Sequence, residues 1–198
     1  MFSKLLRKQT VLLWACLTMA MIGSVVQAKD SRVQEAMKDW YSGLKQDKVV
    51  YAVNCGGDND LLDDHGVTFK ADKDFSGGQA TSGCGMHRWP MPNSQIYHSE
   101  RWGESFSYKV PLSLEKDSQH TLVLKFSECY FWEPGMKVFD ILIGDTFIVR
   151  DMDPFRLAGA KLLPGDDFYD IQVRGGKLYI DGKWITNGII NGKLEIVF

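Results

Sequence analysis

The sequence has no excess of basic residues and, after its start, no long apolar run. Its 198 residues carry a formal net charge of -2, with 23 Lys and Arg against 25 Asp and Glu. This balance argues against nucleic acid as a partner and against an electrostatic membrane patch. No apolar run beyond residue 28 is long enough to span a membrane, so we expect a soluble mature chain.

Repeats, low-complexity segments and metal-site spacings are also missing. The four His are scattered, and the Cys lack the paired spacing of zinc ligands, so we expect no metal and no cofactor. No Asn-x-Ser/Thr acceptor occurs, which argues against N-glycosylation. An acidic loop does not match a calcium loop, and a solvated loop is favoured over a calcium site. Its acidic residues are Asp58, Asp60, Asp63 and Asp64.

Cysteine is scarce. If Cys16 leaves with a signal peptide, Cys55, Cys84 and Cys129 remain in an oxidising compartment. Three thiols allow one disulfide and one free Cys, and the sequence does not choose among the three pairings. The alternative is that all three are reduced and buried as small apolar side chains.

Residues 1–28 have the pattern of a secretory signal peptide. A basic start is followed by a mostly apolar run and by a small-residue cleavage site that ends at Ala28. An uncleaved membrane anchor is the alternative. Cleavage would start the mature chain at Lys29 and place it in the secretory pathway. The C-terminus shows no lumenal retention signal, so we expect either the endoplasmic reticulum lumen or secretion.

The mature chain divides into two predicted parts. Residues 29–47 form an arm, in which apolar residues at helical spacing predict a short amphipathic helix over 31–44. Residues 48–198 show short apolar strands separated by Gly-rich turns, which predicts an all-β domain, a β-sandwich or jelly roll. The predicted strands are 49–53, 106–110, 121–126, 138–143, 146–149, 168–173, 178–180 and 193–198.

One predicted strand ends in three consecutive aromatics, Tyr130, Phe131 and Trp132, followed by a Pro-Gly turn. A strand can bury only alternate side chains in one core, so at least one of these rings should project outward. Rings held at the end of a rigid strand form a stacking platform. The alternative is that two rings close the core and the third is a surface bystander.

Several segments, in this order and spacing, resemble the malectin family. They are 53–57 (VNCGG), 64–69 (DHGVTF), 97–102 (YHSERW), 126–131 (FSECYF), 137–140 (KVFD) and 151–153 (DMD). The resemblance runs from about residue 49 to the last residue. It implies a non-catalytic, lectin-type β-sandwich of the secretory pathway, with an oligosaccharide or N-glycan as ligand. Short glucose-containing units of immature N-glycans are the implied sugars, and quality control of glycoproteins is the implied process.

The resemblance also implies a carbohydrate-binding set. The family's Tyr-Phe pair is present as Tyr130 and Phe131, and Trp102 stands where the family usually has Tyr. Cys84 stands at another family Tyr, so one ring is lost there, and Trp132 and Trp89 could supply a compensating ring. The acid of the family's site lies beyond the final predicted strand. These departures bear on the sugar specificity more than on the fold.

Two other function classes remain open. A protein-interaction or receptor-type module would use the same rings to bind a polypeptide, a glycoprotein or a membrane partner. A glycosidase would need paired carboxylates, and the candidates are Glu100, Glu128, Asp140, Asp151 and Asp153. Glu128 should point inward from its strand, and we expect a cation such as Arg101 to pair with it. Asp151 and Asp153 should cap turns after their strand.

Overall fold

The computed structural model describes residues 48–82 and 94–198. The predicted signal peptide, the arm 29–47 with its helix, and Cys84 lie outside the described residues. All described residues belong to one compact unit, Gln46–Phe198. Within the described ranges, no helix combines the length and the apolar character needed to cross a membrane.

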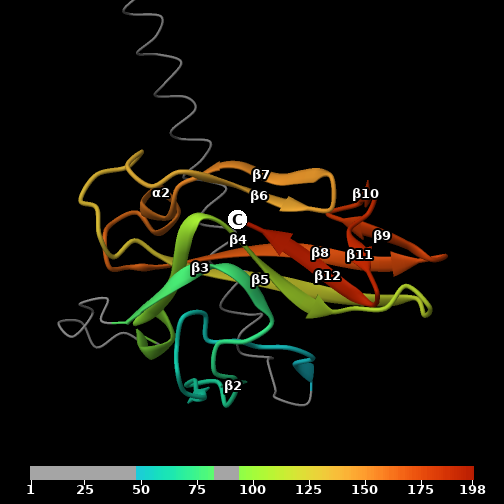
Figure 1. Ribbon diagram of the computed structural model, residues 1–198, viewed down its shortest axis with the longest axis horizontal. Helices are drawn as coiled ribbons and strands as arrows, with labels where there is room; N and C mark the ends of the chain where they lie inside the picture. The colour runs from blue at the N-terminus through green and yellow to red at the C-terminus, as the bar shows by residue number, and fades with distance from the viewer. Residues whose placement is uncertain (1–47, 83–93) are drawn as a thin grey trace, which may run out of the picture. The chain divides into compact units, whose positions relative to one another are not determined.

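Two antiparallel sheets form a β-sandwich, as the sequence predicts (Figure 1). The larger sheet has the order β3-β4-β12-β6-β7, with β11 paired to β12, and the smaller sheet has the order β10-β9-β8-β5. A separate two-stranded ladder joins β1 and β2. The strands are β1 Leu61–Leu62, β2 Thr68–Phe69, β3 Phe75–Ser82, β4 Ser99–Pro111, β5 Ser118–Ser127, β6 Phe139–Ile143, β7 Thr146–Met152, β8 Pro164–Arg174, β9 Lys177–Ile180, β10 Lys183–Ile185, β11 Ile189–Ile190 and β12 Lys193–Val197.

The core lies between the two sheets and is built by alternation along the strands. Tyr169, Ile171 and Val173 are buried on β8, and their neighbours in the strand are less buried. Leu194 and Ile196 do the same on β12 in the larger sheet. Burying such a side chain contributes about 1.5–3 kcal/mol, so this period of two specifies which face of each strand turns inward.

Seven of the eight predicted strands match observed strands, two of them extending one residue beyond an end, but the predicted strand 49–53 is wrong. That segment makes only an isolated bridge, from Val53 to Lys70. The sequence reading also missed β3 and β10. In β3, Gly77 and Gly78 have positive φ, and the pairing with β4 shifts its register beside them. This break removes the alternation by which strands are recognised.

The described part of the chain contains one α-helix, α2 Pro154–Ala158, and one 3-10 helix, η3 Ser94–Tyr97. Asp153 caps the start of α2, where its side chain accepts hydrogen bonds from the backbone N–H groups of Phe155 and Arg156. The predicted capping role of Asp153 is therefore confirmed. Gly159, which has φ +84°, caps the C-terminus of the helix.

The cysteines are in different states. Cys129 is disulfide-bonded, and Cys55 is free. The two pairings that include Cys55 are therefore wrong, and so is the fully reduced alternative. The partner of Cys129 lies outside the described residues, so the pairing of Cys84 with Cys129 stays a prediction.

The acidic loop is mostly exposed, with one buried carboxylate. Asp58, Asp60 and Asp64 are exposed, and Asp60 pairs with Lys70 at 2.7 Å. Asp63 is buried and accepts hydrogen bonds from the backbone N–H groups two and four residues further on. Nowhere in 48–82 or 94–198 do three or more His, Cys, Asp or Glu side chains form a group that could hold a metal ion. The buried carboxylate of Asp63 therefore stabilises the turn that contains it.

Candidate functional site

The aromatic run follows the end of β5, and two of its three rings lie outside the core. The side chains of Tyr130 and Trp132 are each 76% exposed, whereas Phe131 is half-buried. The rings of Tyr130 and Phe131 lie edge to face, with centroids 5.7 Å apart and an interplanar angle of 65°. An exposed ring therefore rests against a partly buried one, which limits the orientations that it can adopt.

Glu128 lies beneath this pair and is only 1% exposed. Its Oε1 accepts hydrogen bonds from the backbone N–H groups of Tyr130, at 2.6 Å, and Phe131, at 2.9 Å. The inward orientation predicted for Glu128 is confirmed. The predicted partner Arg101 is wrong, because the cation beside Glu128 is Lys137, whose Nζ lies 3.6 Å from Oε2.

Lys137 also contacts the strand that carries Trp102. Its Nζ lies 3.2 Å from Oε2 of Glu100 on β4. Trp102 comes two residues later, so its side chain leaves the same face of the strand about 7 Å away. Trp102 is 47% exposed. No ring contact joins Trp102 to Tyr130 or Phe131 in the part of the chain that the structure describes, so Lys137 is the observed link.

Arg101 points away from Trp102 and anchors β4 from its other face. Its guanidinium donates to Oδ2 of Asp72 through Nη2, at 2.6 Å, and Nε, at 3.1 Å, and lies 3.4 Å from the ring centroid of Phe75. The hydroxyl of Tyr108 donates to the other oxygen of Asp72 at 2.8 Å. Burial is the main cause that raises the pKa of Tyr108 far above its ordinary value. The hydroxyl therefore stays a donor, and the backbone under Trp102 is firmly held.

The loop between β5 and β6 is also attached to the segment around α2. The Nζ of Lys161 donates to the carbonyl oxygen of Tyr130 at 2.9 Å and lies 3.9 Å from the ring centroid of Trp132. Oδ2 of Asp153 accepts a hydrogen bond from the backbone N–H of Gly135 at 2.7 Å. These contacts attach the ring-bearing loop to another part of the fold at both ends.

A buried cluster lies near the disulfide-bonded Cys129. Tyr97 packs against Cys129 and Leu162, and its hydroxyl hydrogen-bonds to Asp166. The Nζ of Lys125 lies 2.6 Å from the same carboxylate. Tyr97 and Trp102 stand in one motif of the sequence, yet Tyr97 belongs to the interior and Trp102 to the surface.

Of the five predicted binding residues, the structure describes Trp102, Tyr130, Phe131 and Trp132. It brings the last three together in one loop, whereas Cys84 is outside the described residues. The sequence reading missed the supporting residues Lys137 and Lys161. Lys137 stood in a motif that carried the family resemblance, which was a usable signal. No sequence signal pointed to Lys161, because its partners lie about thirty residues earlier in the chain.

The fold and site define a class: a β-sandwich domain that presents exposed aromatic rings from a buttressed loop. A family model described as Malectin domain matches residues 49–197. Malectin-A of Xenopus laevis is 35% identical over 163 residues, which cover 79% of this chain and 56% of that protein. Malectin of Homo sapiens is 36% identical over 163 residues, covering 79% and 53%. The chain belongs to the malectin domain family.

The chain spans about half the length of these curated relatives. Solved structures show the same fold. The ANX2 ectodomain from Arabidopsis thaliana matches with a TM-score of 0.55 at 17% identity, over 74% of this chain and 43% of that chain. The ANX1 ectodomain from the same plant matches with a TM-score of 0.53 at 20% identity, over 74% and 42%.

Proposed function

We propose that this domain is a non-catalytic, lectin-type module that binds short glucose-containing oligosaccharides, such as those of immature N-glycans. Membership of the malectin domain family supports this function. The observation that carries it is the exposure of Tyr130 and Trp102 on a backbone that buried ion pairs and hydrogen bonds hold in place. Rigid exposed rings lose little conformational entropy when a ligand covers them.

The proposed binding mode is stacking of a sugar face on these rings. A pyranose presents C–H groups on one face, which an aromatic ring can cover, and hydroxyls around its edge. Lys137 and Glu100 each retain about a quarter of their side-chain surface, at 25% and 23%, and could bind such hydroxyls beside Trp102. Stacking of about 1–3 kcal/mol per ring, by analogy with nucleic-acid bases, gives an affinity no tighter than micromolar for two rings.

We further propose that the domain acts in the secretory pathway, in the endoplasmic reticulum lumen or after secretion. The signal-peptide pattern of residues 1–28 supports this location. Its partners there would be glycoproteins or membrane components that carry the sugar. Several copies of the sugar on one partner would raise the effective affinity of a weak site.

An enzyme is less well supported. A glycosidase needs two carboxyl groups that flank the glycosidic bond. Glu128 is sealed in the interior, and one of its oxygens already accepts two backbone hydrogen bonds. A protein-interaction or receptor-type module is the second candidate, because Tyr and Trp are the side chains that dominate protein interfaces. The matched ectodomains share this fold.

A glycan array probed with the mature chain tests these proposals. The lectin proposal expects binding to α-linked glucose oligosaccharides that free maltose competes away. Loss of that binding in Trp102→Ala and Tyr130→Ala, with folding intact, would place it at the rings. A protein partner retained in excess free sugar would favour the interaction module. Turnover of a chromogenic glycoside that is lost in Glu128→Gln would show an enzyme and overturn the lectin proposal.

A further inference from the structure

We infer that Glu128 is the positioning residue of the ring site, and that Lys137 couples it to the strand that carries Trp102. The inference rests on the proposed function, in which Tyr130, Phe131 and Trp102 contact the sugar. Glu128 itself is buried and touches no ligand. It would act through the backbone of the two residues that carry the rings.

The geometry at Glu128 shows how one carboxylate could set two rings. The pairing of β5 with β8 ends at Ser127, so the backbone N–H groups after it need other acceptors. Oε1 of Glu128 accepts from Tyr130 and Phe131 at once. Both bonds fix the direction of the backbone at the point where each Cβ leaves it. The direction of the two rings follows from this.

The second oxygen explains why Lys137 matters. Oε2 of Glu128 is buried and has no hydrogen-bond donor among the described residues. Its nearest compensation is the Nζ of Lys137, which lies 3.6 Å away and is also 3.2 Å from Glu100. A buried carboxylate without a donor is unfavourable unless a cation lies near it. The same Lys137 ammonium group therefore lies beside the buried carboxylate of Glu128 and contacts Glu100 on β4.

A merely structural carboxylate would stabilise the whole domain without affecting the rings in particular. Amide NMR of the expressed protein separates these cases. In the wild type we expect the amide protons of Tyr130 and Phe131 to be shifted downfield and strongly protected from exchange. Such protection is unexpected beside a side chain as exposed as that of Tyr130. Exchange at the rate of an open loop would overturn the inference without any mutation.

Glu128→Gln keeps the shape and one acceptor oxygen but removes the charge. We expect both amide protons to move upfield and to exchange about tenfold faster, because hydrogen bonds to charged acceptors are about twice as strong as neutral ones. Affinity for maltose should fall by a similar factor. The matched control is Ile196→Val, which trims a buried core residue. It should lower the melting temperature and leave both amides and the maltose affinity unchanged.

Glu100→Gln tests the coupling and guards against a Glu128→Gln variant that does not fold. Its side chain is only partly buried, so folding should survive. Glu100 is one of the two carboxylates beside Lys137. Removing its charge should move the Tyr130 and Phe131 amide signals, although Glu100 lies about thirty residues away in sequence. Unchanged signals in Glu100→Gln would refute the coupling. Unchanged Tyr130 and Phe131 exchange in Glu128→Gln, or a change no larger than that of core amides, would refute the positioning role.

These measurements separate failure of the inference from failure of the proposed function. If the wild type binds no sugar, the proposed function fails, and the amide signals still test the positioning role. If the wild type binds maltose and Glu128→Gln binds it equally well, the positioning role fails while the lectin stands.

Discussion

The aromatic residues of this protein fall into a buried group and an exposed group, and the two groups have different roles. Tyr97, Tyr108 and Tyr169 are buried, and each hydroxyl meets a carboxylate, so these rings stabilise the fold. Tyr130 and Trp132 are mostly exposed, so a ligand can reach both rings, with Lys161 lying over one face of Trp132. Burial of a ring with a satisfied hydroxyl favours the folded state, whereas an exposed ring contributes little until something covers it.

The first residue-scale prediction concerns the exposed rings. Tyr130→Ala and Trp102→Ala should each weaken maltose binding by about tenfold, because each removes one stacking surface worth about 1–3 kcal/mol. Isothermal titration calorimetry measures this directly. The melting temperature should change little, because Tyr130 is mostly exposed and Trp102 is about half exposed.

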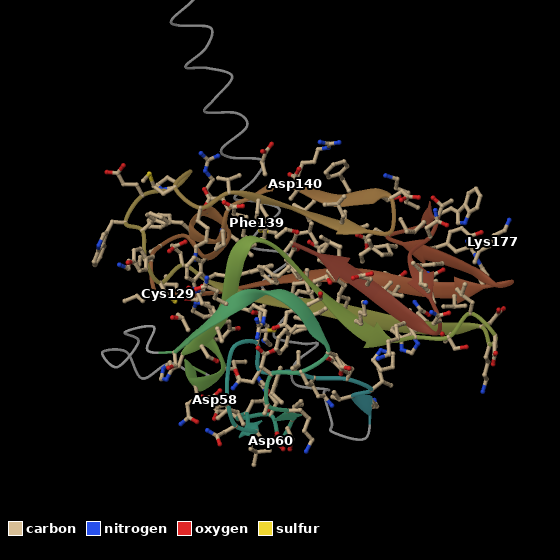
Figure 2. All side chains as sticks on the ribbon, in the orientation of Figure 1. Asp58, Asp60, Cys129, Phe139, Asp140 and Lys177 are labelled. Atoms are coloured by element: carbon tan, nitrogen blue, oxygen red, sulfur yellow. The ribbon has the colours of Figure 1, made fainter. Side chains whose placement is uncertain are left out.

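Trp184 offers a matched control for this prediction. It is 55% exposed and lies near Lys177, which Figure 2 shows at the opposite end of the domain from Cys129. Trp184→Ala removes an equally large exposed ring outside the proposed site. It should leave maltose binding unchanged, and an equal loss in Trp184→Ala would argue against ring stacking at the proposed site.

At the scale of elements, the loop between β5 and β6 is ordered by its neighbours. Three side chains hydrogen-bond to its backbone: Glu128 from within the loop, Asp153 from the start of α2, and Lys161 from the segment after α2. A loop without such contacts would sample many conformations, and binding would have to offset the lost entropy. Because these contacts hold the loop in one conformation, they lower the entropy that sugar binding would have to offset.

The second prediction tests the support from α2. Asp153→Ala removes the helix cap and the acceptor for the N–H of Gly135, and should lower the free energy of unfolding by about 2–3 kcal/mol. It should also weaken maltose binding, because the far end of the loop is released. Urea unfolding and titration measure the two effects. Asp153→Asn keeps an acceptor oxygen, so most of both quantities should be retained.

The third prediction concerns the approach of Gly56 to the start of β4. A Cβ at Gly56 would lie 2.1 Å from the carbonyl oxygen of Glu100, and its φ is +73°. Gly66 has a similar φ, +77°, but a Cβ there meets nothing within 4 Å. Gly66→Ala should cost about 1–2 kcal/mol for the left-handed conformation alone.

Gly56→Ala should cost clearly more, because the clash displaces the strand that carries Glu100 and Trp102. Thermal unfolding compares the two variants. Equal destabilisation would show that the strand adjusts to the added methyl group and that the close approach has no special role.

For the molecule as a whole, the burial of neutral thiol and phenol groups should lower the free energy of unfolding at alkaline pH. Burial is the main cause that raises the pKa of Cys55 from 9.0 to about 11. It also raises the pKa of Tyr51, Tyr108 and Tyr169 above their ordinary value. Each of these groups prefers its neutral form in the folded state.

The fourth prediction follows from the sign of this linkage. Below about pH 8 these groups are neutral in both states, so the free energy of unfolding is unaffected by them. As pH rises from about 8 to 11, the unfolded chain ionises before the folded chain does, so unfolding becomes easier. The share of Cys55 is about 2–3 kcal/mol at most. Urea unfolding across this range should show the fall, and Cys55→Ala should make it less steep; a flat profile in the wild type would contradict the prediction.

Local sequence patterns were enough to predict the fold class, the family and most of the strands. Alternation along β8 and β12 is a local pattern, because every second side chain of a strand faces the same way. The same alternation correctly predicted that the side chain of Glu128 points inward. The misreadings fall where local pattern is weak: β3 has two glycines at positive φ, and residues 49–53 are apolar without forming a strand.

The surroundings of the rings, in contrast, follow from contacts between distant parts of the chain. The cation beside Glu128 is Lys137 rather than Arg101, and Lys161 reaches Tyr130 from a segment 31 residues away. Ion pairs and cation–π contacts have no period along a chain, since they depend on which elements the sandwich brings together. A sequence can therefore show which residues are rings and which are strands, but the support that makes rings into a site is a property of the folded molecule.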